Sequence, residues 1–335
     1  MKSWKGFIKR VLLGKSKKKM KVLITGGTGF LGGRIAQHLS AQNYQIYLGT
    51  RKNKEVFDWL PEACVFHTDW ENMDSFKSVC EEVDIIIHAA GMNAIESQKN
   101  PVEAFNFNGM KTAELVAIAE KTNVKKFIYF STAHVYSRPL IGKINENTCP
   151  SNLHPYATSH LFGEYAVLGN AQEGNMQGLV VRLSNAFGAP VDENVNCWML
   201  LVNDLCRQAI IDRKLVLHTA GLQYRDFVSL GFVESAIFFL INNENSDSNH
   251  NIFNIGSGKS IRVLDMAEKI QQRCELLFNY TPELSRIMPG NDKNMPVLSY
   301  MNEKLLNSGF RYEEDVDAEI DATLEFCRKV FGENK

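Results

Sequence analysis

The chain has 335 residues, of which 44% are hydrophobic and 22% are charged, a composition typical of globular proteins. This composition excludes a disordered chain, a collagen-like fibre and a small disulfide scaffold. The formal net charge of −1 argues against a nucleic-acid partner, because no general basic field surrounds the chain. Eight of the 37 basic residues lie within residues 1–20, which contain no acidic residue, so this segment is considered separately from the body.

The seven cysteines are odd in number and include no C-x-x-C pair, which favours reduced thiols in a cytoplasmic protein. No His/Cys cluster has the spacing of zinc ligands, so no metal site is predicted. No apolar run approaches the roughly 18 residues of a membrane-spanning helix. The amino terminus lacks the uninterrupted apolar core and cleavage site of a secretory signal.

Residues 1–19 contain one apolar helical stripe with lysines around it. The stripe consists of Trp4, Phe7, Ile8, Val11 and Leu12. A basic amphipathic helix of this kind can bind an anionic membrane surface, which makes peripheral membrane contact one interpretation. The alternatives are docking to a partner, a disordered or body-packed tail, and a true start at Met20, where M-K-V-L-I-T begins.

Short apolar runs alternate with helical patterns along the next 160 or so residues, which predicts βαβ crossovers and a parallel sheet covered on both faces. Six strands are predicted, at Lys21–Thr25, Gln45–Leu48, Cys64–Phe66, Val83–Ile87, Lys126–Phe130 and Gly178–Leu183. Helices are predicted at Phe30–Leu39, at 101–121 and at Tyr156–Leu168. The prediction is an α/β protein with a doubly wound Rossmann sheet.

The alternation loosens after residue 184, where a smaller α/β lobe is predicted. Strand-like pieces occur at Lys214–His218 and Asn251–Ile255, and helical patterns occur near 262–276 and 315–330. The predicted organisation is an extension at 1–19, a Rossmann domain at 20–184, and a mainly substrate-binding lobe at 185–335. Parts of 214–255 are expected to return to the Rossmann domain.

Residues 25–32 read T-G-G-T-G-F-L-G and lie directly between a predicted strand and a predicted helix. Gly26 permits the tight turn, Gly29 lets a pyrophosphate approach the backbone, and Gly32 lets helix and strand pack closely. The helix N-terminus supplies N–H donors to the phosphates. The motif therefore predicts dinucleotide binding, with Thr28, Phe30 and Leu31 also in the binding turn.

The residues after the second strand indicate which dinucleotide is preferred. An acidic residue there binds the ribose 2′-hydroxyl of NAD, but this chain has Arg51 and Lys52, which suit the 2′-phosphate of NADP(H). NADP(H) is therefore favoured, with NAD(H) as the alternative. Asp69, just past the third strand, is a candidate partner for the adenine amine.

Seven motifs in order resemble the extended short-chain dehydrogenase/reductase family, in particular its nucleotide-sugar epimerases, dehydratases and reductases. They are T-G-G-T-G-F-L-G, D-I-I-I-H-A-A-G, the predicted helix that contains Asn108, F-I-Y-F-S-T-A-H-V-Y, P-Y-A-T-S-H, R-L-S-N-A-F-G and Y-R-D-F-V. The resemblance covers about Met20 to Phe331. It implies that Ala89, Ala90, Gly91 and Asn108 border the cofactor, and that the protein is a homodimer formed through a helix pair.

The resemblance also implies the catalytic residues. Tyr156 is the acid/base and also borders the cofactor, and Thr132 binds the same substrate oxygen. Four residues after Tyr156 the family has a lysine, whereas this chain has His160, which would contact the cofactor ribose with partial charge at best. Three readings stay open: an active enzyme that uses protonated Tyr156 as an acid, a slow or pH-dependent enzyme, or a non-catalytic relative.

The sugar 4,6-dehydratases of the family follow the catalytic threonine with Asp-Glu, but this chain has Ala133 and His134, which argues against dehydration. The resemblance implies that Asn185 and Arg225 hold a nucleotide diphosphate, with Arg286 as a second arginine. The leading hypothesis is NADPH-dependent reduction of a 4-keto-(deoxy)sugar nucleotide in the synthesis of polysaccharide or glycoconjugate precursors. The alternatives are a 4-epimerase that retains NAD and a non-catalytic cofactor-binding scaffold.

Overall fold

The computed structural model describes residues 19–53, 55–173, 176–243, 251–288 and 295–332. A seven-stranded sheet lies at its centre, in the order β11-β7-β5-β4-β1-β2-β3, with every neighbouring pair parallel. The strands are β1 (Lys21–Thr25), β2 (Gln45–Thr50), β3 (Cys64–His67), β4 (Ile85–His88), β5 (Lys126–Thr132), β7 (Gln177–Leu183) and β11 (Ile252–Ile255). This confirms the predicted Rossmann sheet.

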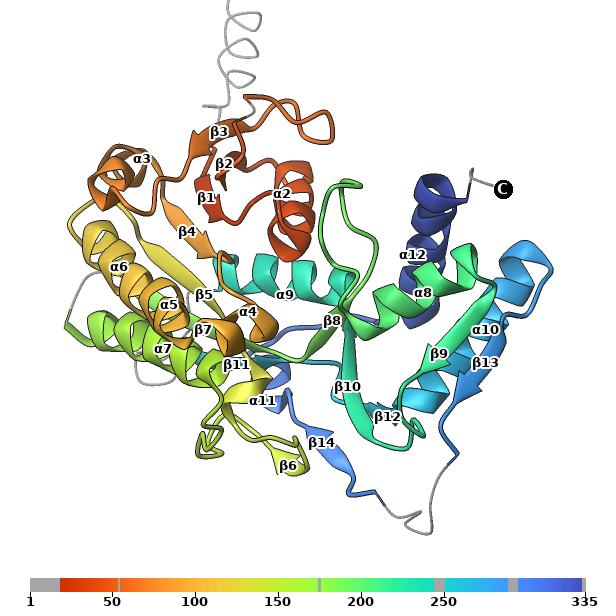
Figure 1. The fold of residues 1–335 in the computed structure, drawn as a ribbon. Helices are drawn as coiled ribbons and strands as arrows, with labels where there is room; N and C mark the ends of the chain where they lie inside the picture. Colours follow the sequence, from red (N-terminus) through yellow and green to blue (C-terminus); the bar gives the residue numbers. More distant parts are fainter. Residues whose placement is uncertain (1–18, 54, 174–175, 244–250, 289–294, 333–335) are drawn as a thin grey trace, which may run out of the picture.

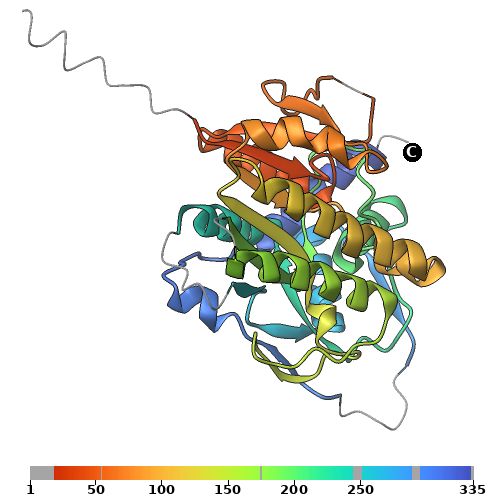
Figure 2. The same ribbon diagram turned by 90° about the vertical axis from the view of Figure 1, so that its left-hand side faces the viewer.

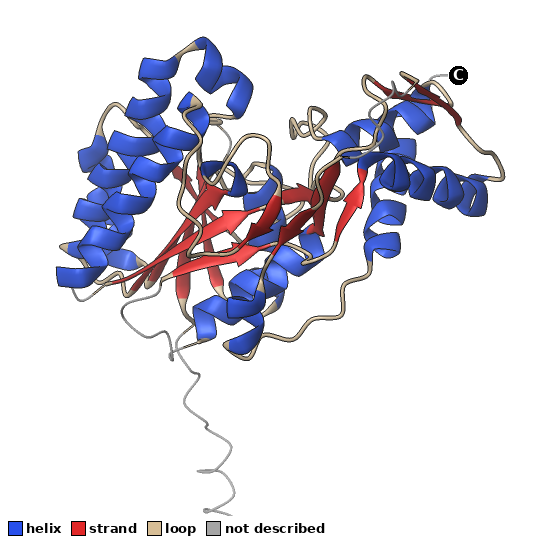
Figure 3. Ribbon diagram, turned by 90° about the horizontal axis from the view of Figure 1, so that it is seen from below, coloured by secondary structure: helices blue, strands red, loops and turns tan. Residues whose placement is uncertain are grey.

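Alternate residues of each strand face opposite layers, since successive side chains of a strand point to opposite faces. In β1, Val22 and Ile24 pack into one core, while Leu23 packs into the other. The first core lies under α2 (Phe30–Ala41) and α9 (Leu230–Asn242). The second lies under α3 (Phe76–Glu82), α6 (Thr112–Glu120) and α7 (Pro155–Glu173). Figure 3 shows helices on both sides of the sheet, and Figure 2 shows α6 and α7 side by side.

The helix predicted at 101–121 contains a π-helical segment that the sequence pattern did not predict. It begins as α5 (Pro101–Ala104), continues as η2 (Phe105–Lys111) and ends as α6. Gly109 of η2 leaves room for the ring of Phe162 on α7, because a Cβ at position 109 would lie 2.3 Å from that ring. π-helical turns occur often at functional sites.

Two strand predictions change in the structure. The fourth strand begins at Ile85 rather than at Val83, because Val83 caps α3 and the Asp84 carboxylate accepts a hydrogen bond from the Lys21 amide. The segment predicted at Lys214–His218 forms β9 (Lys214–Leu217), which pairs with β13 (Glu283–Arg286) outside the central sheet. By contrast, β11 does join the central sheet, where it pairs with β7.

The remaining elements form the second lobe and the rim of the molecule, with α8, α10 and α12 packed around a separate apolar core (Figure 1). The lobe helices are α8 (Leu201–Ile211), α10 (Val263–Phe278) and α12 (Val316–Phe331). The strands are β8 (Asn185–Phe187), β10 (Tyr224–Ser229) and β12 (Ser260–Arg262), with β6 (Gly142–Ile144) pairing β14 (Leu298–Tyr300). Short helical segments are η1 (Met73–Ser75), α4 (Ala94–Lys99), η3 (Ala133–Val135) and α11 (Glu303–Asn307).

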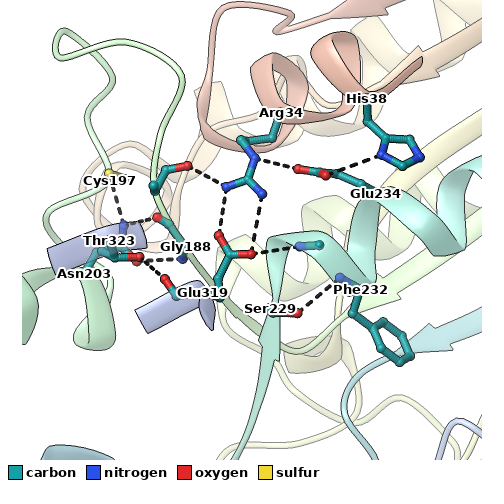
Figure 4. Close-up of polar contacts among 12 residues, drawn as sticks. Arg34, His38, Gly188, Cys197, Asn203, Ser229, Phe232, Glu234, Glu319 and Thr323 are labelled. Atoms are coloured by element: carbon teal, nitrogen blue, oxygen red, sulfur yellow. Dashed lines mark hydrogen bonds and ion pairs between the residues drawn. The ribbon is translucent and has the colours of Figure 1, made fainter. Parts of the chain in front are cut away.

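A charged cluster ties helix α2 of the sheet domain to helix α12 of the second lobe (Figure 4). The Arg34 guanidinium contacts Glu319 of α12 at 2.8 Å and Glu234 of α9 at 2.6 Å. Arg34 also donates to the carbonyl of Ala189, and the Gly231 amide donates to Glu319. We call Arg34, Glu234 and Glu319 the clasp.

The basic amphipathic extension predicted at 1–19 lies outside the described residues, apart from Lys19. Among the described residues, no helix combines the length and apolarity needed to cross a membrane. All seven cysteines are unpaired with one another.

Candidate active site

A cavity of about 540 Å³ lies where the carboxyl ends of the central strands face the second lobe. Its position is at the topological switch point between β1 and β4, where ligands bind in open α/β sheets. Twelve of the residues predicted from the sequence line it: Gly26, Gly29, Phe30, Leu31, Gly32, Ala89, Gly91, Thr132, Tyr156, His160, Asn185 and Arg225.

The glycine turn forms one end of the cavity. Gly26 has φ +66°, a left-handed conformation that favours glycine, and a Cβ on Gly32 would lie 2.3 Å from the Gly26 carbonyl oxygen. Gly29 precedes α2 without a side-chain cap, so the first-turn amides of the helix are available to an anion. These residues fit a dinucleotide pyrophosphate.

Tyr156 and Thr132 both line the cavity. Thr132 is the last residue of β5, and Tyr156 lies in the first turn of α7. Burial raises the pKa of Tyr156 above its ordinary value of 10.0, while a hydrogen bond with the Thr132 side chain acts in the opposite direction. Tyr156 is therefore a protonated phenol at neutral pH.

His160 lies beside Tyr156, with the two ring centroids 4.7 Å apart in an edge-to-face arrangement. Its side chain is 7% exposed, and burial lowers its pKa from 6.5 to about 4. The imidazole is therefore neutral at pH 7, and it supplies no positive charge to Tyr156. Burial therefore removes even the partial positive charge that the sequence analysis predicted for His160.

Comparison with known proteins gives the family directly. The family model described as the NAD dependent epimerase/dehydratase family matches residues 22–256. The chain belongs to this family. It is 26% identical over 333 residues to the dTDP-D-glucose 4,6-dehydratase of Homo sapiens, covering 93% of this chain and 91% of that protein. It is 25% identical over 269 residues to the UDP-glucose 4-epimerase of Halalkalibacterium halodurans, covering 76% and 80%.

The solved structures show the same fold. The UDP-glucose 4-epimerase of Thermotoga maritima, solved with UDP-glucose, superposes with a TM-score of 0.77 at 19% identity, over 92% of this chain and 99% of that one. The UDP-glucuronic acid 4-epimerase of Bacillus cereus, solved with NAD, superposes with a TM-score of 0.77 at 18% identity, over 94% and 98%. The Rossmann fold is therefore shared with these epimerases.

The family asparagine, Asn108, does not line the cavity. Its side chain accepts a hydrogen bond from the Met92 amide at 2.8 Å and donates to the Ser159 hydroxyl at 3.0 Å. It therefore joins η2 to α7 and to the loop after β4, and it acts on the cavity through Gly91 and Met92. Ala90 lies behind the glycine turn, where its amide is 2.9 Å from the position of a Cβ on Gly26.

Four further predicted residues lie outside the cavity lining. Thr28 contacts Thr50 through the two hydroxyls at 3.2 Å, and Asp69 accepts hydrogen bonds from the amides of the turn that follows it. Arg51 and Lys52 are exposed at the end of β2, and no acidic partner contacts them among the described residues. Their positions leave both side chains free to approach a ligand that extends past β2.

A second cavity of about 500 Å³ shares Tyr156, Asn185 and Arg225 with the first. Burial lowers the pKa of the Arg225 guanidinium, and no carboxylate pairs with it in the described part of the chain. Asn185 donates to the Asp226 carbonyl at 2.9 Å.

Arg286 lines neither cavity, because it lies on the outer strand β13 and donates to the Ala220 carbonyl at 2.9 Å.

The electrostatics of the two cavities are one-sided. The second cavity is lined by Arg138 in addition to Arg225. Among the described residues that line either cavity, none is aspartate or glutamate. An unpaired, partly buried guanidinium is costly without an anion, so the arrangement suits a negatively charged ligand.

Sequence reasoning missed a buried ion pair behind β5. Arg182 of β7 contacts Glu164 of α7 at 2.6 Å, and the Ser131 hydroxyl donates to the same carboxylate. The Arg182 guanidinium also stacks over the Tyr136 ring at 4.7 Å. These residues hold α7, and therefore Tyr156, against β5. Each partner is distant in sequence, so no local motif revealed the pair.

Proposed function

We propose that the protein is a nicotinamide-dinucleotide-dependent oxidoreductase that reduces a 4-keto-(deoxy)sugar carried on a nucleoside diphosphate. The observation that carries the proposal is Tyr156 in the cavity lining with Thr132, protonated and beside a neutral His160 rather than an ammonium group. When bound, the dinucleotide supplies the hydride that this reaction needs. The glycine turn, Ala89 and Gly91 would hold it at one end of the cavity.

The protonation state of Tyr156 favours reduction. In that direction the phenol gives its proton to the ketone oxygen, which becomes a hydroxyl, and Thr132 hydrogen-bonds the same oxygen. The opposite direction requires the phenolate at the start of the reaction. Buried and beside a neutral imidazole, Tyr156 forms the phenolate less readily than a tyrosine that lies next to an ammonium group.

Arg225 supports a nucleotide-diphosphate substrate. It lies where the two cavities meet, and its guanidinium can fork onto phosphate oxygens. Arg138 extends the same positive environment away from the glycine turn. In this arrangement the diphosphate lies at Arg225 and the sugar reaches Tyr156.

Arg51 and Lys52 support NADP(H) as the cofactor, because both are exposed beyond β2 without an acidic partner in the described residues. The solved relatives named above include one bound to NAD, so NAD(H) is the competing choice. Equilibrium binding of NADPH and NADH to the wild type and to Arg51→Ala tests this: the arginine substitution should weaken NADPH alone. Equal weakening of both would remove the preference.

A 4-epimerase is the second candidate, and the similarity to UDP-glucose 4-epimerases favours it. Consumption of NADPH with a 4-keto-6-deoxy sugar nucleotide supports reduction. Tightly retained NAD and interconversion of UDP-glucose and UDP-galactose without net redox change supports epimerisation and contradicts our proposal. Dinucleotide binding without turnover of either substrate would identify a scaffold.

We also infer that the enzyme is a homodimer through α5, η2 and α7. Exposed apolar side chains gather on these helices: Val102, Phe105, Met110, Phe162 and Tyr165. Light scattering should give a dimer for the wild type and a monomer for Phe105→Glu/Tyr165→Glu. Leu276→Glu, at an exposed apolar position of α10, is the matched control and should stay dimeric.

A further inference from the structure

His160 is one end of a hydrogen-bond chain that crosses the layer between the sheet and α7. The Tyr129 hydroxyl of β5 lies 2.9 Å from His160 Nδ1 and 3.2 Å from the Asn108 carbonyl oxygen. The Thr112 hydroxyl donates to the same carbonyl at 2.8 Å, and it lies 3.0 Å from His88 Nε2. His88 Nδ1 lies 2.6 Å from the Thr25 hydroxyl.

The direction of each bond follows from the one group that can only accept. The backbone carbonyl of Asn108 can only accept, and the hydroxyls of Thr112 and Tyr129 both donate to it. The Thr112 oxygen must then accept from His88 Nε2–H. His88 Nδ1 consequently accepts from Thr25, whose oxygen accepts from the Ala90 amide at 3.4 Å.

The contact with Tyr129 bears on the proton of His160. When the Tyr129 hydroxyl donates to the Asn108 backbone carbonyl, its oxygen accepts from His160 Nδ1–H. A neutral imidazole carries one N–H, so Nε2 keeps a lone pair. Nε2 has no hydrogen-bond partner among the described residues, and it lies near Gly91 on the wall of the cavity.

We propose that Tyr129 is a positioning residue that holds His160 in the Nδ1–H tautomer, so that Nε2 presents a hydrogen-bond acceptor to a hydroxyl of the bound dinucleotide. This is the reverse of what a lysine offers at the same place, since an ammonium group can only donate. At this position the protein therefore has a neutral hydrogen-bond acceptor, His160 Nε2, where a lysine would place a positive charge. The proposal rests on dinucleotide binding in this cavity, and not on which sugar reaction follows.

Local packing supports the position of Tyr129. Gly163 of α7 leaves room for the hydroxyl, because a Cβ there would lie 2.5 Å from the Tyr129 oxygen and 2.7 Å from the Asn108 carbonyl oxygen. Tyr129 and His160 are almost fully buried, so water does not compete for their contact. The π-helical segment η2 carries the shared carbonyl.

The tautomer can be measured without any ligand or turnover. Nitrogen NMR of histidine-labelled full-length protein, with His160 assigned by difference against His160→Gln, should show a proton on Nδ1 and none on Nε2 at pH 7. A proton on Nε2, or on both nitrogens, would overturn the proposal. This readout holds even if the proposed sugar reaction is wrong.

Binding supplies the second test. Tyr129→Phe should move the His160 proton partly to Nε2 and weaken NADPH or NADH binding by about five- to tenfold, the loss of about one hydrogen bond. Tyr300→Phe is the matched control, because Tyr300 is equally buried and donates to the Arg182 carbonyl away from the cavity. If both variants weaken the dinucleotide equally, or neither does, Tyr129 has no positioning role.

If Tyr129→Phe fails to fold, Gly163→Ala provides the same test from the neighbouring helix. The added methyl group would displace the Tyr129 hydroxyl. Gly169→Ala on the same helix, where a Cβ meets nothing within 4 Å, is its control. The proposal requires a tautomer shift at His160 in the first variant and none in the second.

Discussion

Two buried polar networks support this enzyme in different ways. The chain from Thr25 to His160 is built of neutral groups, and each proton in it has one direction. The clasp of Arg34, Glu234 and Glu319 is built of charges and joins helices from both lobes. Hydrogen-bond direction orders the first network, whereas ion pairing orders the second and ties the lobes together.

The two networks also respond to pH in opposite ways. Burial lowers the pKa of His160 to about 4 and that of His88 to about 3, so both are neutral in the folded protein. Burial and the nearby Glu319 raise the pKa of Glu234 to about 7, although Arg34 acts against the shift. The histidines of the first network therefore resist gaining a proton, whereas Glu234 of the clasp resists losing one.

The largest expected effect is a loss of reaction rate in a variant that leaves both networks in place. Tyr156→Phe removes the proton donor, and we expect the reduction rate to fall by about 10² to 10⁴-fold, the usual contribution of a general acid. Thermal unfolding should change little, because Tyr156 belongs to neither network. Rates and melting curves measured on the same preparation check this. Retention of more than a tenth of the rate would exclude Tyr156 as the acid.

Removing the cation of the clasp should give the largest loss of stability. Arg34→Met removes the cation from two neighbouring buried carboxylates, and the expected loss is about 3–5 kcal/mol of the free energy of unfolding. Urea denaturation measures it. Arg262→Met is the control: its pair with Asp265 is partly solvent-exposed, and its loss should cost much less. Equal losses in the two variants would mean that the clasp is only a surface contact.

The opposite pH responses can be separated by two variants. The folded pKa of Glu234 lies above its ordinary 4.5, so its stabilising contribution is present below pH 4.5 and is lost as pH rises towards 7. The free energy of unfolding of the wild type should therefore fall between pH 4.5 and 7, and Glu234→Gln should abolish this fall. Arg34, His38 and Glu319 surround this carboxyl, and His38 titrates with a lowered pKa in the same cluster.

His160 gives the reverse sign. Its folded pKa lies below the ordinary 6.5, so the protein loses stability as pH falls from 6.5 to about 4. His160→Gln should reduce that acid loss and leave the change above pH 6.5 intact. Unfolding free energies from urea titrations at intervals between pH 4 and 8 check both variants. Parallel wild-type and variant curves would refute the assigned protonation states.

The smallest expected effect comes from restoring the family's lysine. His160→Lys places an ammonium group near Tyr156 and should lower the pKa of the phenol. Oxidation of the alcohol product at pH 7 should then speed up by about tenfold, with less change in reduction. Steady-state rates in both directions measure the ratio. A protein inactive before and after the substitution would be a scaffold rather than an enzyme.

Local patterns were enough for the parts of the fold that depend on neighbours in sequence. The apolar runs predicted the strands, because a buried parallel strand needs apolar side chains on both faces. The turn after Thr25 was predicted from its glycines, because a positive φ and a close helix–strand approach are local requirements. Tyr156 and Thr132 were found by resemblance, and the structure brings them together.

Contacts between distant segments could not be predicted in this way. The apolar run at Lys214–His218 has a strand pattern, but only packing decides that β9 pairs with β13 rather than with the central sheet. Arg286 resembled a phosphate ligand in sequence, yet the fold places it on that outer strand. The π-helical segment at 105–111 also has no signature in periodicity.

The sequence by itself determined a Rossmann sheet, a glycine turn between a strand and a helix, and a tyrosine followed four residues later by histidine. Tertiary structure alone decided the state of that histidine, because its proton is set by Tyr129 and by the Asn108 carbonyl, 31 and 52 residues away in the chain. It likewise decided that Arg34 meets Glu319, 285 residues away. Burial makes such contacts strong by excluding water, and burial is a property of the folded chain.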